Sequence, residues 1–146
     1  MSLDVESRLA LARDEPAVVE FLSELDANVQ TDLDDDAVRW LTLHPRSSPS
    51  EIYIARIIWS VYPHREPSVL FTDSVRGALG VQSAWPNIAG YRAPNDICMP
   101  FTVEGFNTHN EWRLGPQAWS ALGNPYLRVV VQLQDDFDHR YQGRAG

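Results

Sequence analysis

The segment of residues 52–61 constrains the fold more than any other part of the sequence. It carries Ile, Tyr, Trp and Val at both odd and even positions, so a strand built from it is apolar on both faces. Such strands lie inside a sheet, where both faces are covered. Shorter segments that also favour strands lie on either side of it: residues 28–33, 37–44 and 68–72.

Turn-forming residues separate the first three of these segments. The acidic run 34–36 and the segment 45–50, with two prolines and three serines, both favour tight turns. Strands joined by short turns pair antiparallel. The sequence therefore predicts a four-stranded antiparallel meander. A metal loop at the acidic run would need further oxygen ligands nearby.

Helical patterns precede the strands. We expect one helix over residues 3–12 and a second that begins near Pro16, because proline is favoured in the first turn of a helix. The apolar stripe of the second helix repeats at helical spacing: Val18, Leu22, Leu25 and Val29. Its opposite face is acidic and is expected to be solvated: Glu15, Glu20 and Glu24.

A C-terminal helix is predicted to begin at Asn124 and Pro125 and to stop at Gly143, from the capping preferences of these residues. Its apolar stripe is Tyr126, Val130, Leu133, Phe137 and Tyr141. Residues 73–123 hold neither helical nor strand periodicity, and a long irregular segment in a compact domain is often functional. Because no linker or repeat divides the chain, we expect residues 1–146 to form a single α+β domain.

The composition excludes several classes of function. The net charge is −8 and the twelve basic residues, all arginines, are scattered singly, so we expect no nucleic-acid partner. An arginine-rich genome or work beside lysine-modifying machinery would each explain the absence of lysine. No apolar run approaches the roughly 20 residues of a membrane span. Residues 1–13 lack the apolar centre of a signal peptide. We therefore expect a cytoplasmic protein without a membrane partner, and its single cysteine allows no internal disulfide.

Four local motifs resemble, in order, motifs of the ubiquitin-conjugating enzymes. Residues 62–71 (YPHREPSVLF) resemble the tyrosine–proline, proline, phenylalanine signature between the third and fourth strands of that family. Residues 85–88 (WPNI) resemble its histidine–proline–asparagine motif, with tryptophan in place of histidine. Residues 95–99 (NDICM) are similar to the segment around the active cysteine. A tryptophan and a proline follow, as in the family, at positions 112 and 116.

The resemblance covers residues 3–137 and implies an N-terminal helix and C-terminal helices on one side of the four-stranded sheet. It implies that Cys98 accepts a ubiquitin-like modifier from an activating enzyme as a thioester and passes it to an amine of a target protein, without a cofactor. A thiolate suits this chemistry because it is both a strong nucleophile and a fair leaving group. The resemblance assigns Asn87, eleven positions before Cys98, to the stabilisation of the oxyanion.

His109, eleven positions after Cys98, is a candidate base for the thiol or the attacking amine. A surface or capping role is the alternative. A cysteine hydrolase would use Cys98, His109 and an orienting Asn107 or Glu111, but no strand-to-helix nucleophile signature is present. A metal site built on Cys98, His109 and a carboxylate lacks the paired ligand spacing of zinc sites. The main alternative is a catalytically inactive relative that only binds a modifier or scaffold, with Cys98 buried.

Three departures from the family are visible in the sequence. Trp85 replaces the histidine of the asparagine motif, which alters how that loop is held. The N-terminal helix is acidic, whereas in many members it is basic and meets the activating enzyme. There is room for only one long C-terminal helix. Together they suggest a divergent member of the kind expected in a bacterial conjugation pathway.

Overall fold

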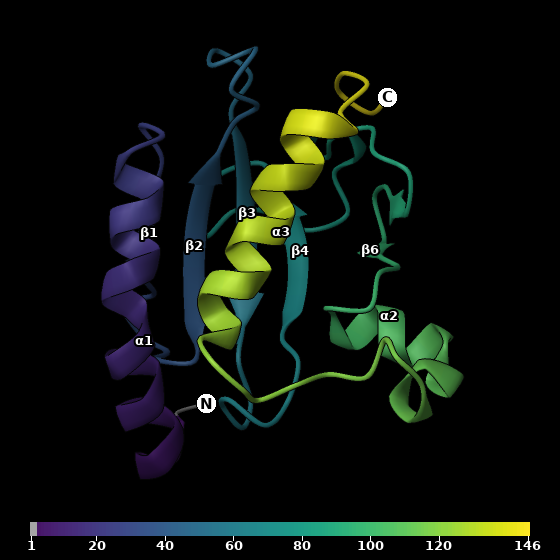
Figure 1. Cartoon of the computed structure of the whole chain (residues 1–146). Coiled ribbons are helices and arrows are strands. Elements are labelled where there is room, and N and C mark those ends of the chain that lie inside the picture. Colours follow the sequence, from purple (N-terminus) through teal and green to yellow (C-terminus); the bar gives the residue numbers. More distant parts are fainter. Residues whose placement is uncertain (1–2) are drawn as a thin grey trace.

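The computed structural model describes residues 3–146. An antiparallel sheet stands at the centre, and two long helices, α1 (Val5–Ser23) and α3 (Pro125–His139), pack on the same face of it (Figure 1). The apolar side chains of these helices and of the inner sheet face form one core. The expected α+β architecture, with an N-terminal helix, a four-stranded sheet and a C-terminal helix, is confirmed. No helix within residues 3–146 is long and apolar enough to cross a membrane.

The four strands of the sheet pair in chain order, each antiparallel to the next. Their bounds are Asn28–Thr31 (β1), Val38–Leu43 (β2), Tyr53–Ile58 (β3) and Ser68–Thr72 (β4). The register sets Leu41, Ala55 and Phe71 opposite one another, and all three are buried beneath the helices. The predicted meander is confirmed, with β4 at the expected bounds and β3 four residues shorter than expected.

The N-terminal region forms one helix, so the predicted break before Pro16 is wrong. Asp4 caps α1 by accepting the backbone N–H of Ser7 at 2.8 Å, and Pro16 lies inside the helix. A proline inside a helix costs about 3 kcal/mol. The residues that α1 buries continue at helical spacing on both sides of the proline, and their burial offsets this cost: Ser7, Leu11, Asp14, Val18 and Leu22.

Glu15 is not part of a solvated face, as the sequence suggested. Its carboxylate accepts a hydrogen bond from Arg39 of β2 at 2.6 Å, and the Arg39 side chain is only 8% exposed. The hydroxyl of Tyr126 in α3 donates to the same carboxylate at 2.9 Å. Glu15 therefore joins α1, the sheet and α3. Glu20 and Glu24 are exposed, as expected.

Helix α3 begins as predicted but ends four residues earlier than Gly143. The side chain of Asn124 accepts the N–H of Leu127 at 2.9 Å and caps the helix. Beyond His139 the chain turns toward the sheet, and the hydroxyl of Tyr141 lies 2.6 Å from that of Tyr53. This tertiary contact outweighs the local helical pattern.

The segment after β4 reaches the opposite edge of the sheet. Arg76 forms ion pairs with Asp32, at 3.5 Å, and with Asp34, both in the turn after β1. Asp32 also accepts the indole N–H of Trp40 at 2.9 Å. The rest of the predicted irregular segment contains short elements: η1 (Gln82–Ala84), β5 (Tyr91–Arg92), β6 (Asp96–Ile97), α2 (Val103–Thr108) and η2 (Asn110–Leu114).

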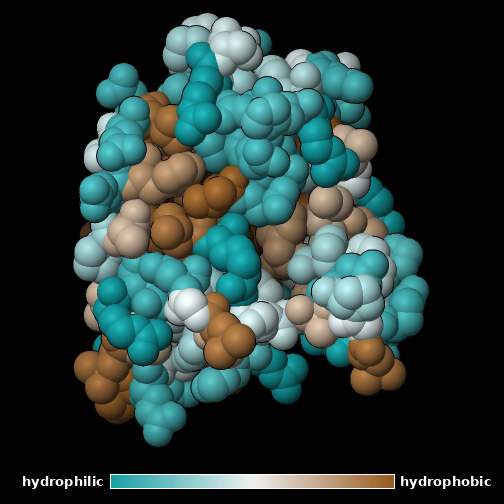
Figure 2. Space-filling model, in the orientation of Figure 1, coloured by the Kyte–Doolittle hydropathy of each residue, from teal (hydrophilic) through white to brown (hydrophobic). Residues whose placement is uncertain are grey.

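The helix face of the molecule shows apolar surface in the furrow between α1 and α3 (Figure 2). A hollow of about 110 Å³ lies there, between Phe21 and Val131, with Arg46 and Asp138 at its rim. Arg46 and Asp138 pair at 3.2 Å. The furrow therefore contains apolar side chains, and the Arg46–Asp138 ion pair lies at its edge.

Glu15→Ala is expected to lower the free energy of unfolding by about 2–4 kcal/mol, because it leaves the buried guanidinium of Arg39 without its carboxylate. Glu20→Ala removes the same side chain from an exposed position of the same helix and is expected to cost less than about 0.5 kcal/mol. Urea denaturation measures both values. Similar losses in the two variants would mean that the Glu15–Arg39 pair does not hold α1 on the sheet.

Candidate active site around Cys98

A short hairpin holds the single cysteine. Strands β5 and β6 pair antiparallel, and the backbone N–H of Cys98 donates to the carbonyl of Gly90 at 2.8 Å. Gly90 has φ +93°, a backbone conformation that favours glycine, and a Cβ there would lie 2.7 Å from the sulfur of the flexible Met99 side chain. The hairpin sets Cys98 opposite Gly90, only three residues beyond Asn87.

The Cys98 side chain is half-buried, and the thiol is free. Ile97 before it is fully buried and anchors the strand in the core. The hydroxyl of Thr102 donates to the carbonyl of Ile97 at 2.6 Å and accepts the N–H of Gly105 at 2.9 Å. Thr102 thus caps α2 and fixes the turn that follows Cys98, so the thiol sits on a rigid support.

An apolar cleft of about 220 Å³ opens directly after Cys98. Residues 99–101 and 118–120 line it together with side chains of α3. The guanidinium of Arg128 in α3 donates to the carbonyls of Ser120 and, at 3.0 Å, Leu122, and lies 5.1 Å from the ring centre of Trp119. Arg128 therefore holds the wall of the cleft.

Trp85, the first residue of the segment 85–88, is a core residue. It is 1% exposed and packs edge-on against Phe71 with ring centres 5.1 Å apart. Its indole N–H has no hydrogen-bond partner within residues 3–146. Two positions later, Asn87 is exposed, and its side-chain amide makes no hydrogen bond in this part of the chain. Packing of Trp85 thus fixes the loop and leaves the Asn87 amide free to meet a ligand.

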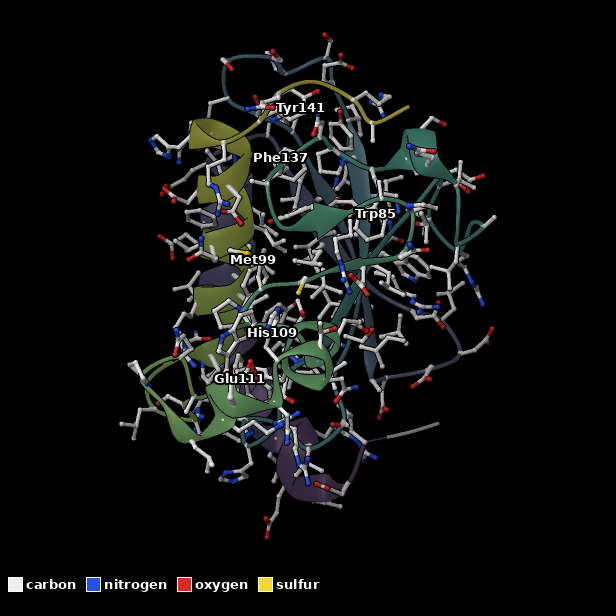
Figure 3. All side chains as sticks on the ribbon, turned by 90° about the vertical axis from the view of Figure 1, so that its right-hand side faces the viewer. Trp85, Met99, His109, Glu111, Phe137 and Tyr141 are labelled. Carbon is white, nitrogen blue, oxygen red and sulfur yellow. The ribbon has the colours of Figure 1, made fainter. Side chains whose placement is uncertain are left out.

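His109 lies at the far end of α2 and is the C-cap of that helix. Its ring stacks on Trp112 with centres 4.3 Å apart, and its Nδ1 lies 3.2 Å from the carboxylate of Glu111. Backbone hydrogen bonding and the bond to His109 lower the pKa of Glu111, which therefore stays charged and orients the ring. In Figure 3, Met99 lies between Trp85 above and His109 below.

The structure places the predicted residues on three neighbouring segments of the chain without joining their side chains. Asn87 lies before the turn that leads into the hairpin, Cys98 follows the second strand of the hairpin, and His109 ends α2. No hydrogen bond links the side chains of these three residues in the described chain, 3–146. The guanidinium of Arg92 lies 3.4 Å from the hydroxyl of Thr108 and connects the hairpin to the end of α2.

Sequence reasoning missed the charged pair beside the thiol. Arg92 and Asp96 face each other across the hairpin with two hydrogen bonds, at 2.7 and 2.8 Å. These bonds and the negative charge of Asp96 raise the pKa of Arg92. The sequence places Arg92 and Asp96 on either side of a Pro-Asn turn, and opposite charges at such positions predict a cross-strand ion pair.

No group of three or more His, Cys, Asp or Glu side chains that could hold a metal ion occurs among residues 3–146. The chain was also compared with known proteins. No family model matches it, and no curated protein matches its sequence.

Asp96→Asn is expected to speed the labelling of Cys98 by a small thiol probe about two- to fivefold at pH 7 and low salt. The variant removes a negative charge near the thiolate and leaves Arg92 uncompensated, and one surface charge interaction has about this size. Asp26→Asn, in the turn after α1 where φ is +53°, is the control and is expected to label like the wild type. Slower labelling of the Asp96 variant would contradict the expected effect of this pair.

Proposed function

We propose that this protein is a divergent ubiquitin-conjugating enzyme that carries a ubiquitin-like modifier as a thioester on Cys98. The observation that supports it most is the hairpin, which holds a free, partly exposed cysteine eleven residues after an exposed asparagine. The three motifs lie where the proposal expects them: residues 62–71 run from the β3–β4 connection into β4, residues 85–88 follow η1, and residues 95–99 contain β6. A cytoplasmic location, an activating enzyme and a target protein belong to the same proposal.

Loading exchanges one thioester for another. The Cys98 thiolate attacks the thioester carbonyl of the loaded activating enzyme, a new carbon–sulfur bond forms, and the donor's thiolate leaves. The apolar cleft lined by residues 99–101 begins one residue after Cys98 in the sequence. Cys98 is half-buried, so part of the residue stays open to the acceptor.

Discharge forms an amide. The acceptor amine attacks the thioester carbonyl, the Asn87 amide donates to the developing oxyanion, and the Cys98 thiolate leaves as the carbon–sulfur bond breaks. The amine must also lose a proton. His109, oriented by Glu111, takes it directly or through water. An amide donor on an oxyanion is typically worth about 10²–10³ in rate.

Two other functions fit the geometry less well. A cysteine hydrolase would need a hydrogen bond between His109 and Cys98, and His109 instead bonds Glu111 and stacks on Trp112. An inactive binding module would bury its lone cysteine in the core, and Cys98 is half-buried at the surface. The binding-module hypothesis is the second candidate and is tested by the same experiments.

Cys98→Ala is expected to abolish loading and to leave the free energy of unfolding within about 1 kcal/mol, because the side chain is only half-buried. The acyl donor is a short peptide ending in glycine as its mercaptoethanesulfonate thioester, which needs no activating enzyme. Mass spectrometry detects the peptide on the protein and its release by hydroxylamine. Failure of the wild type to load, or equal loading of the variant, would favour the binding module.

Asn87→Ala is expected to slow transfer of the peptide from Cys98 to free lysine about 100-fold, while loading changes less than about threefold. The reason is that the oxyanion stabilised by Asn87 forms during attack by the amine. Asn28→Ala, at an exposed position of β1, is the control. Equal losses in loading and transfer would show that Asn87 maintains the shape of the loop.

A further inference from the structure

The segment 142–145 pairs with the asparagine motif through an isolated antiparallel bridge between Pro86 and Arg144. The N–H of Asn87 donates to the carbonyl of Gly143 at 2.7 Å, and the N–H of Gln142 donates to the carbonyl of Asn87 at 2.9 Å. The N–H of Ala145 donates to the carbonyl of Trp85 at 2.9 Å. Both backbone polar groups of Asn87 are therefore bound to the segment 142–145.

Arg144 anchors this segment from the other side. Its guanidinium donates to the carbonyls of Ser83, at 2.8 Å, and Ile52, at 3.2 Å. It also lies 4.2 Å from the ring centre of Tyr53 and 3.4 Å from the carboxylate of Glu51. One exposed side chain thus ties the C-terminal segment to the start of β3 and to the turn before Trp85.

We infer that Arg144 is a positioning residue for the transfer step, acting through segment 142–145 on the orientation of Asn87. This inference rests on the proposed function. The Asn87 side chain itself makes no hydrogen bond within residues 3–146, so its direction depends on its backbone. The two backbone bonds to segment 142–145 set that direction. Buried residues hold the loop on both sides of Asn87, Trp85 before it and Ile88 directly after it, but the two bonds to segment 142–145 are the ones that the Asn87 backbone itself makes.

A looser C-terminal segment should leave Cys98 unchanged. The thiol is held by the hairpin, by the buried Ile97 and by the cap of α2, none of which contacts Arg144 through a hydrogen bond. Loss of Arg144 is therefore expected to separate the two half-reactions. Loading at Cys98 continues at the normal rate, and transfer to an amine slows.

The test compares Arg144→Ala, Arg144→Lys and the wild type with the glycine-peptide thioester as donor and free lysine as acceptor. Arg144→Ala is expected to load within about twofold of the wild type and to transfer about tenfold more slowly. Arg144→Lys keeps a cation over Tyr53 and one donor, so it is expected to recover part of the rate. Arg46→Ala removes an exposed, ion-paired arginine elsewhere and is expected to behave like the wild type.

Two further measurements distinguish a role of Arg144 in positioning Asn87 from a general loss of structure in the variant. Amide hydrogen exchange at Asn87 is expected to be faster in Arg144→Ala, with exchange at Cys98 unchanged. In an Asn87→Ala background, Arg144→Ala is expected to cause no further loss of transfer, because residues that act through one group are not additive.

Three outcomes would overturn the inference. They are unchanged transfer in Arg144→Ala, equal losses in loading and transfer, and additive effects of the Arg144 and Asn87 substitutions. A wild-type protein that forms no thioester at Cys98 would instead overturn the proposed function itself. Failure of the proposed function can be distinguished from failure of the inference, because the missing thioester is seen with the wild type before any variant is compared.

Discussion

The packing around Phe71 is the constraint on which the rest of the structure depends. Its ring lies within 6.3 Å, centre to centre, of aromatic rings from four other parts of the chain: Tyr53, Trp85, Tyr91 and Phe137. These belong to β3, the asparagine motif, the hairpin and α3. One side chain of β4 therefore sets the distance between the sheet, the helix layer and the segment that carries the candidate site. Because protein interiors are close-packed, a change at this point would move all four.

Local features of the fold were predictable, and features decided by distant contacts were not. The strands and the start of α3 follow from composition and capping, which act within a few residues. The break before Pro16 was wrong because burial on both sides of the proline outweighs its local cost. The helix does not reach Gly143 because Tyr141 turns back to Tyr53. In the same way, the sequence named Cys98, Asn87 and His109 as candidates but gave no sign of the pairing between Asn87 and the C-terminal segment.

Helix α3 and the residue that caps its C-terminus support the candidate site through polar contacts. The hydroxyl of Tyr91 in the hairpin donates to Asp136 at 2.7 Å, and Arg140 donates to the carbonyl of Ala89 at 2.9 Å. Burial raises the pKa of Asp136, although its hydrogen bonds with Tyr91 and Gln132 oppose the rise. Burial also raises the pKa of Tyr91, which keeps its proton for this bond. The turn between Asn87 and Cys98 is therefore held at its centre as well as at its ends.

The proposed function offers a chemical reason for the absence of lysine. A thioester on Cys98 reacts with any amine that reaches it, and a lysine side chain on the same protein would compete at a high effective concentration. All twelve basic side chains are arginines, which stay protonated and do not act as acceptors. At Asp96 the planar guanidinium of Arg92 also makes two parallel hydrogen bonds to one carboxylate, a geometry that the ammonium of lysine does not provide. The same residue choice thus stabilises the fold and protects the loaded thiol from transfer to the side chains of its own chain.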